Sequence, residues 1–176
     1  DVGGLAEYNC LPEQNCVKLP DDFDLVDAAM IEPMTVGLHA LSLMHFTPDK
    51  PVAIIGAGTI GMLIVQAVKA FGAKTIYVFD VNDKKLEQAR GFGATHIYNT
   101  TEEGFLDRFL ADTDGFGSPQ VIEAVGIEET VLLAFEVGSV MCETAIIGEM
   151  RAPITIPAFN FYRRISYRQQ NLHGVY

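Results

Sequence analysis

Three glycines, Gly56, Gly58 and Gly61, follow a short apolar run and open a helical pattern with the spacing G-x-G-x-x-G. The first position permits a tight turn, the second lets a phosphate approach the backbone, and the third lets a helix pack closely on a strand. The leading amides of that helix, those of Thr59, Ile60 and Gly61, favour an anion because they lack intrahelical acceptors. The motif therefore predicts a site for the pyrophosphate of a dinucleotide.

An acidic residue, Asp80, ends the next apolar run, 19 residues after Gly61. In dinucleotide-binding folds, a carboxylate at about this sequence separation from the glycines accepts hydrogen bonds from the hydroxyls of the adenosine ribose. Its charge repels a 2′-phosphate, so the sequence predicts NAD rather than NADP. The alternative is an ordinary turn with incidental glycines, and the strand–turn–helix–strand context speaks against it.

Alternating strands and helices must position these residues. We expect strands near residues 52–55, 75–79, 95–98, 120–125, 144–147 and 171–175, with helices between them. This alternation is typical of an α/β fold, a Rossmann doubly wound parallel six-stranded sheet in the order 3-2-1-4-5-6. Ligands bind such sheets at the carboxyl ends of the strands, where we expect Val125, Gly126 and Gly148 to join Gly56 and Asp80.

The segment before the first strand is expected to contain one helix. Asp24 would cap it near Leu25, and it would run toward His45 with Pro33 as an internal disturbance. Residues 1–20 are broken by glycines and prolines and carry no core of their own.

Composition excludes several classes of function. The net charge of −11 argues against nucleic-acid binding, and no apolar run is long enough to span a membrane. The three cysteines form no C-x-x-C pair, which favours reduced thiols and a cytoplasmic location. A hydrophobic content of 49% suggests surfaces that face a partner. Because the chain has no initiating Met, we expect it to be a piece of a longer protein.

Three segments resemble the medium-chain zinc-containing alcohol and polyol dehydrogenases, in particular the sorbitol, threonine and galactitol-phosphate dehydrogenases. They are GGLAEYNCLPEQNCVKLPDDFDLVDAAMIEPMTVGLHAL, VAIIGAGTIG and VFDVNDKKLEQARGFGATH. The resemblance implies that residues 1–45 are the end of a catalytic domain with its connecting helix. Residues 46–176 would then be the NAD-binding Rossmann domain.

The resemblance also implies roles for single residues. Glu32, next to Pro33, would lie at the catalytic zinc of the full-length enzyme, as a ligand directly or through water. Lys85 would join Asp80 beside the adenosine ribose, and Val125 and Gly148 would line the nicotinamide side. The family's other zinc ligands match nothing in this sequence, so we expect no catalytic residue, no bound zinc and no activity in this chain alone.

The function implied is oxidation of a secondary alcohol of a polyol or related small molecule, with hydride transfer to NAD in a zinc-dependent enzyme. The resemblance further implies a homodimer or homotetramer built through the last strand, without nucleic-acid or membrane partners. Two alternatives stay open: a nucleotide-sensing regulatory module and a zinc-free quinone reductase of the same superfamily. Glu32-Pro33 and the segment GGLAEY argue against the sensing module, and Asp80 and Glu32 argue against the reductase.

Some residues are left without a role. Glu123 lies in a strand expected to be buried and therefore needs a partner. The pair Arg163 and Arg164 suggests an anion site, but a solvated face is the simpler interpretation. Met141-Cys142-Glu143 stands where the resembling family has a Gly-Gly turn.

Overall fold

The computed structural model describes residues 4–175 of the chain, which divides into two compact units, Asp1–Ile31 and Glu32–Tyr176. The first unit contains a short 3-10 helix, η1 (Glu13–Asn15), and one turn of helix, α1 (Leu25–Ala28). As expected, Asp24 caps α1, because its Oδ1 accepts hydrogen bonds from the backbone N–H groups of Val26 and Asp27.

The second unit begins with α2 (Ile31–Leu43), so the single helix expected from Leu25 onward is wrong. The interruption falls at residues 29–30 and not at Pro33. Pro33 lies in the first turn of α2, where a missing N–H removes no intrahelical hydrogen bond. The proline therefore favours the start of a helix here.

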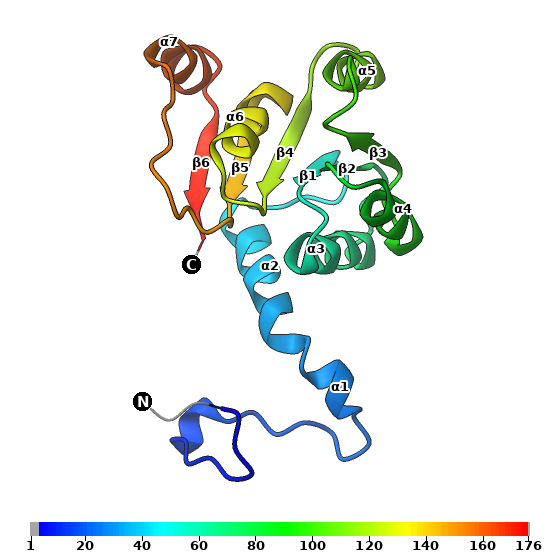
Figure 1. Cartoon of the computed structure of the whole chain (residues 1–176), viewed down its shortest axis with the longest axis vertical. Helices are drawn as coiled ribbons and strands as arrows, with labels where there is room; N and C mark the ends of the chain where they lie inside the picture. Colours follow the sequence, from blue (N-terminus) through cyan, green and yellow to red (C-terminus); the bar gives the residue numbers. More distant parts are fainter. Residues whose placement is uncertain (1–3, 176) are drawn as a thin grey trace. The chain divides into compact units, whose positions relative to one another are not determined.

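Six parallel strands form one sheet in the order β3-β2-β1-β4-β5-β6, which confirms the predicted Rossmann topology (Figure 1). Their bounds are β1 (Val52–Ile55), β2 (Ile76–Asp80), β3 (His96–Asn99), β4 (Ser118–Glu123), β5 (Gly138–Ile146) and β6 (Asn171–Gly174). The order reverses between β1 and β4, so their carboxyl ends form the switch point at which such sheets bind ligands.

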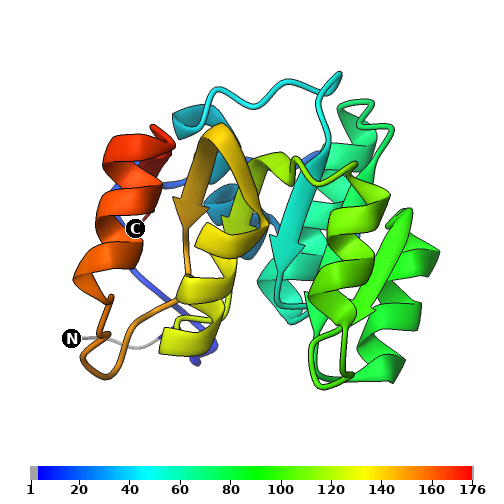
Figure 2. The same cartoon turned by 90° about the horizontal axis from the view of Figure 1, so that it is seen from above.

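Helices cover both faces of this sheet, as the view from above shows (Figure 2). The helices that follow β1 in the chain are α3 (Thr59–Ala70), α4 (Asp83–Phe92), α5 (Phe105–Asp112), α6 (Glu128–Val137), α7 (Ala158–Phe161) and the π-helix η2 (Tyr162–Tyr167). Buried side chains of α2, α3 and α4 share one core, and those of α5 and α6 share another. No helix formed by residues 4–175 combines the length and apolar character needed to cross a membrane.

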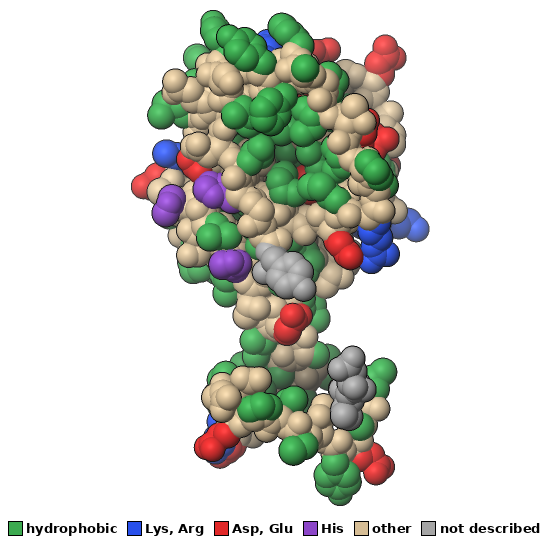
Figure 3. Space-filling view, turned by 90° about the vertical axis from the view of Figure 1, so that its left-hand side faces the viewer, with side chains coloured by type: hydrophobic (Ala, Val, Ile, Leu, Met, Phe, Trp, Pro, Cys, Tyr) green, Lys and Arg blue, Asp and Glu red, His purple; other side chains and the backbone are tan. Residues whose placement is uncertain are grey.

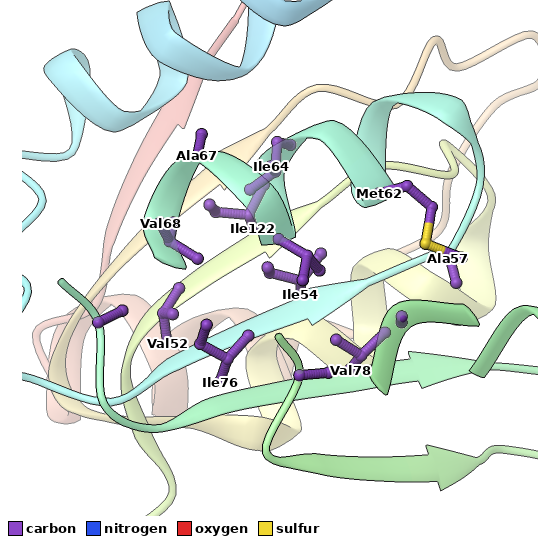
Figure 4. Packing of buried hydrophobic residues seen from close by; sticks show 14 of the residues in the cluster. Val52, Ile54, Ala57, Met62, Ile64, Ala67, Val68, Ile76, Val78 and Ile122 are labelled. Carbon is purple, nitrogen blue, oxygen red and sulfur yellow. The ribbon is translucent and has the colours of Figure 1, made fainter. Parts of the chain in front are cut away.

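The core on the α3 face fixes the strand that leads to the glycines. Val52 and Ile54 of β1 are fully buried and lie opposite Ile64 and Val68 of α3 (Figure 4). Full burial of one such side chain contributes roughly 1.5–3 kcal/mol. The alternate residues of β1 pack into the second core, so β1 is held from both sides.

A buried amide anchors the turn before β1. Gln120 of β4 is 2% exposed, and its Oε1 accepts from the N–H of Thr47 at 2.7 Å. Its Nε2 donates to the carbonyls of Thr47 and Lys50 at 3.0 and 3.1 Å. The side chain thus holds the turn before β1 through hydrogen bonds to its backbone.

Strand β5 begins earlier than expected and is irregular where the family's Gly-Gly turn is missing. Met141 has φ of 58°, and the β4–β5 register shifts between Ser118 and Gln120. The N–H of Met141 donates to the carbonyl of Arg168 at 2.9 Å, and regular pairing resumes at Glu143. The turn geometry is therefore provided by a non-glycine residue.

Candidate cofactor-binding site

The glycine-rich loop joins β1 to α3, and its three glycines meet different surroundings. Gly56 has φ of 99°, and a Cβ on it would lie 2.5 Å from Cγ2 of Val125. A Cβ on Gly61 would overlap the carbonyl oxygen of Gly56, so helix and strand approach each other closely there. A Cβ on Gly58 would meet no atom within 4 Å. Gly56 and Gly61 are thus needed by the fold, while Gly58 faces open space.

The loop ends at the amino terminus of α3, which has no side-chain cap. Gly58 is the N-cap residue, and its carbonyl accepts from the N–H of Met62 at 2.9 Å. The N–H groups of Thr59, Ile60 and Gly61 form the first turn, where a helix has no internal acceptors. Together with the helix dipole, these donors suit the pyrophosphate predicted from the sequence.

Asp80 ends β2 directly beside this loop. Its Oδ2 accepts from the N–H of Ala57 at 2.7 Å, and its Oδ1 accepts from the N–H of Asn82 at 2.9 Å. Each carboxylate oxygen keeps a further lone pair for a ribose hydroxyl. Asp80 lines a cavity of about 140 Å³ together with Gly56 and Val125. The first glycine of the motif and the predicted ribose-binding acid therefore line one cavity, whereas Gly58 and the first turn of α3 are not among its lining residues.

A larger cavity of about 520 Å³ lies at the carboxyl ends of β4 and β5, and Val125 and Gly126 help to line it. Gly126 has φ of 85°, and a Cβ on Gly148 would overlap the backbone of Gly126. The two loops therefore approach each other closely, which only glycines allow. Val125 lines both cavities, so one side chain links the expected adenosine and nicotinamide ends.

Glu123 is the buried acid whose partner the sequence did not identify. It is fully buried, and its Oε1 accepts from the N–H groups of Val125 and Gly126 at 2.9 and 2.8 Å. Its carbonyl accepts from the N–H groups of Ile147 and Gly148. Its Oε2 has no hydrogen-bond partner within residues 4–175. Glu123 thus holds both loops of the larger cavity, a role signalled in the sequence only by an acid in an apolar strand.

Two further predicted residues lie apart from these cavities. Lys85 is in the first turn of α4, capped by Asn82, and its side chain is exposed. Glu32 is exposed in the first turn of α2. Their roles at the ribose and at zinc stay predictions.

A metal centre is not formed by the described part of the chain. Within residues 4–175, no group of three or more His, Cys, Asp or Glu side chains is placed to hold a metal ion. A catalytic zinc takes three protein ligands. These residues by themselves therefore do not fit a catalytic zinc.

The fold and the glycine-rich loop with its acidic partner define a dinucleotide-binding domain of the Rossmann type. Residues 59–175 match the family described as zinc-binding dehydrogenase, and the chain belongs to this family.

Relatives with known names cover most of this chain. Galactitol 1-phosphate 5-dehydrogenase of Escherichia coli K12 is 35% identical over 159 residues, which are 90% of this chain and 46% of that protein. Sorbitol dehydrogenase of Bacillus subtilis is 31% identical over 158 residues, or 88% of this chain and 45% of that protein. The crystal structure of Escherichia coli galactitol-1-phosphate dehydrogenase superposes with a TM-score of 0.91 at 33% identity, over 99% of this chain and 50% of that one. The chain spans about half the length of the curated relatives it matches.

Proposed function

We propose that this chain binds NAD and supplies the cofactor half of a zinc-dependent dehydrogenase. The observation that carries the proposal is the carboxylate of Asp80, hydrogen-bonded to the glycine-rich loop and lining the same cavity. The adenosine would lie in that cavity and the pyrophosphate over Gly58. The nicotinamide would lie toward Val125 and Gly126, in the larger cavity.

The intact enzyme would oxidise a secondary alcohol of a polyol or a related small molecule. Support comes from the two named relatives, whose names specify galactitol 1-phosphate and sorbitol. NAD, when bound, accepts the hydride. The residues of this chain bind and orient the cofactor, and Glu32 would contribute to the zinc environment. The remaining metal ligands and the alcohol pocket would belong to the other half of the enzyme.

Calorimetric titration of the purified chain with NAD and with NADP tests the cofactor proposal. We expect tighter binding of NAD, because the charge of Asp80 opposes a 2′-phosphate and strengthens its hydrogen bonds to the ribose. Equal affinity, or a preference for NADP, would contradict the assignment. A polyol oxidation assay and metal analysis on the same preparation test the expectation that this chain alone neither turns over substrate nor holds zinc.

The two alternative functions receive less support. A nucleotide-sensing module requires neither Glu32 nor the match to a dehydrogenase family over residues 59–175. A zinc-free quinone reductase linked to NADPH would place a 2′-phosphate against Asp80. Preferential binding of NADP in the titration would favour the reductase.

Association through β6 is the second part of the proposal. Strand β6 pairs only with β5 among the described strands, and its segment QNLHGVY has no Lys, Asp, Glu or Pro to discourage pairing with another chain. Figure 3, which faces this side, shows hydrophobic side chains gathered over the upper part of the molecule. From the end of β5 through β6, the large hydrophobic side chains exposed by more than two fifths are Met150, Phe159, Phe161, Tyr162, Tyr167 and Leu172.

Light scattering at micromolar concentration tests the proposed homodimer. A homotetramer would contain the same β6 interface in each of its two dimers. We expect a dimer for the parent chain and a monomer for Leu172→Lys, since Leu172 is 41% exposed in β6. Val175 is less suitable for substitution because it packs against the core. A monomeric parent, or a dimer unaffected by the new charge, would contradict this interface.

We also propose a cytoplasmic location, because Cys10, Cys16 and Cys142 are all free thiols.

A further inference from the structure

Three arginines gather around a cavity that takes no part in the proposed nucleotide site. Arg163 and Arg164 belong to the π-helix η2, and Arg168 follows it. They line a cavity of about 320 Å³ whose other walls include Phe116, just before β4, and Glu136 of α6. Phe116 precedes the amino end of β4, whereas the glycine-rich loop follows the carboxyl end of β1. The cavity therefore lies toward the amino ends of the strands, whereas the proposed dinucleotide site lies at their carboxyl ends. Figure 1 shows α7, which precedes η2, at the end of the sheet away from the tip of the β4 arrow.

Arg164 contradicts the interpretation of this segment as a solvated face. Its side chain is 3% exposed, and its Nη2 donates to the carboxylate of Glu136. Its Nε and Nη1 are buried and have no hydrogen-bond partner within residues 4–175. A buried guanidinium with unused donors is costly unless further negative charge lies nearby. Arg164 is thus a fixed positive charge in the wall of the cavity.

The cavity carries an excess of positive charge on a chain whose net charge is −11. Three arginines and one glutamate, Glu136, leave a formal charge of plus two among the lining residues. Burial lowers the pKa of Arg168, and the neighbouring charges of Arg164 and Arg163 lower it further. The arginines are therefore close enough to repel one another, and an anion between them would relieve that repulsion.

We propose that this arginine cavity binds the phosphate group of a small organic phosphate. A formal charge of plus two matches a phosphate dianion better than a single carboxylate, and the planar guanidinium fork suits phosphate oxygens. Arg163 is exposed and Arg168 half-buried, so these two side chains can close on the ligand while Arg164 stays fixed. Leu110, Val140 and Phe116 provide an apolar wall for the organic part of the ligand.

Calorimetric titration of the chain with inorganic phosphate and with phenyl phosphate, against acetate at equal ionic strength, tests the proposal. We expect both phosphates to bind, phenyl phosphate more tightly, and acetate to bind weakly or not at all. Arg163→Gln and Arg168→Gln should each weaken phosphate binding about tenfold, since each removes a charge-assisted hydrogen bond. The matched control is Arg90→Gln, which alters an exposed arginine of α4 that pairs with Glu87.

Phosphate has a second possible site at the glycine-rich loop, and Gly58→Val distinguishes the two. Binding by the arginine cavity should persist in folded Gly58→Val and be weakened about tenfold in each of the two arginine variants. Binding lost in Gly58→Val but retained in both arginine variants would overturn the proposal, as would the absence of phosphate binding by the parent chain. Circular dichroism establishes that each variant is folded, and Arg164 is left unchanged because its guanidinium, which pairs with Glu136, is buried.

Discussion

The carboxylate of Asp80 accepts a hydrogen bond from the backbone N–H of Ala57, and Oδ2 and N are 2.7 Å apart. The contact joins the last residue of β2 to the middle of the glycine-rich loop on β1. The side chain that we propose to select the cofactor therefore also fixes the loop that would hold the pyrophosphate. The two parts of the fingerprint are structurally coupled before any cofactor binds.

Asp80→Ala should weaken NAD binding and narrow the difference between NAD and NADP. The variant loses hydrogen bonds to the ribose and to Ala57, and it removes the charge that opposes a 2′-phosphate. Charged hydrogen bonds contribute roughly 1.5–3 kcal/mol each, so we expect NAD affinity to fall about tenfold or more. Calorimetry with both cofactors measures this. Glu87→Ala removes an exposed acid of α4 and serves as the control; an undiminished preference for NAD in Asp80→Ala would contradict the role.

Gly58→Val should abolish dinucleotide binding while the domain stays folded. The added side chain would enter the open space beside Gly58, which is the space proposed for the pyrophosphate. Gly61→Val is the comparison, because its side chain would overlap the carbonyl of Gly56 and should destabilise the fold itself. Thermal unfolding and NAD titration of both variants separate the two effects. Full NAD affinity in folded Gly58→Val would place the phosphates elsewhere.

Glu123→Gln should weaken NAD binding with a smaller effect on the fold. The amide oxygen of Gln can still accept both hydrogen bonds, but it lacks the negative charge that strengthens the contacts to the N–H groups of Val125 and Gly126. We expect a loss of about 1–2 kcal/mol in binding, or several-fold to tenfold in affinity. Urea unfolding is measured alongside, with the exposed Glu103→Gln as control. A destabilised variant with unchanged NAD affinity would limit Glu123 to a structural role.

Glu143 should make stability depend on pH. Burial alone would raise the pKa of this carboxyl, but hydrogen bonds from His173 and Asn171 outweigh it and lower the pKa. The Glu143 Oε2 and His173 Nε2 atoms are 2.6 Å apart. Because the folded-state pKa is below the unfolded one, the stabilisation is present above the unfolded pKa and is lost as pH falls through the folded pKa.

Urea unfolding between about pH 3 and pH 7, a range that spans the usual Glu pKa, tests this dependence. The parent chain should lose about 1 kcal/mol from this group on acidification, and Glu143→Gln should lack that part of the slope. Exposed Glu149→Gln is the control. Identical pH profiles for the parent and Glu143→Gln would show that the hydrogen bonds to His173 and Asn171 contribute nothing.

Local patterns sufficed for much of the fold. The apolar runs and glycine stops placed β1, α3 and β2 to within a residue or so, because burial on both faces gives parallel strands a continuous apolar signal. The predictions for the first helix and for the start of β5 failed, because the local pattern there was compatible with two structures. Pro33 suits a helix interior poorly but a first turn well, and Met141 gave no sign of its positive φ because tertiary hydrogen bonding to Arg168 stabilises it.

The sequence by itself determined the topology of the sheet and the residues of the fingerprint. Glycine spacing and a terminal acid depend on backbone sterics and charge that act over a few residues. Only the tertiary structure decided what Glu123 and Arg164 contact. Glu123 meets loop N–H groups and Arg164 meets Glu136, 28 positions earlier in the chain. A buried charge needs a partner, but its burial does not identify that partner. Tertiary packing brings together segments that are distant in the sequence, and the sequence pattern does not indicate which of them will be in contact.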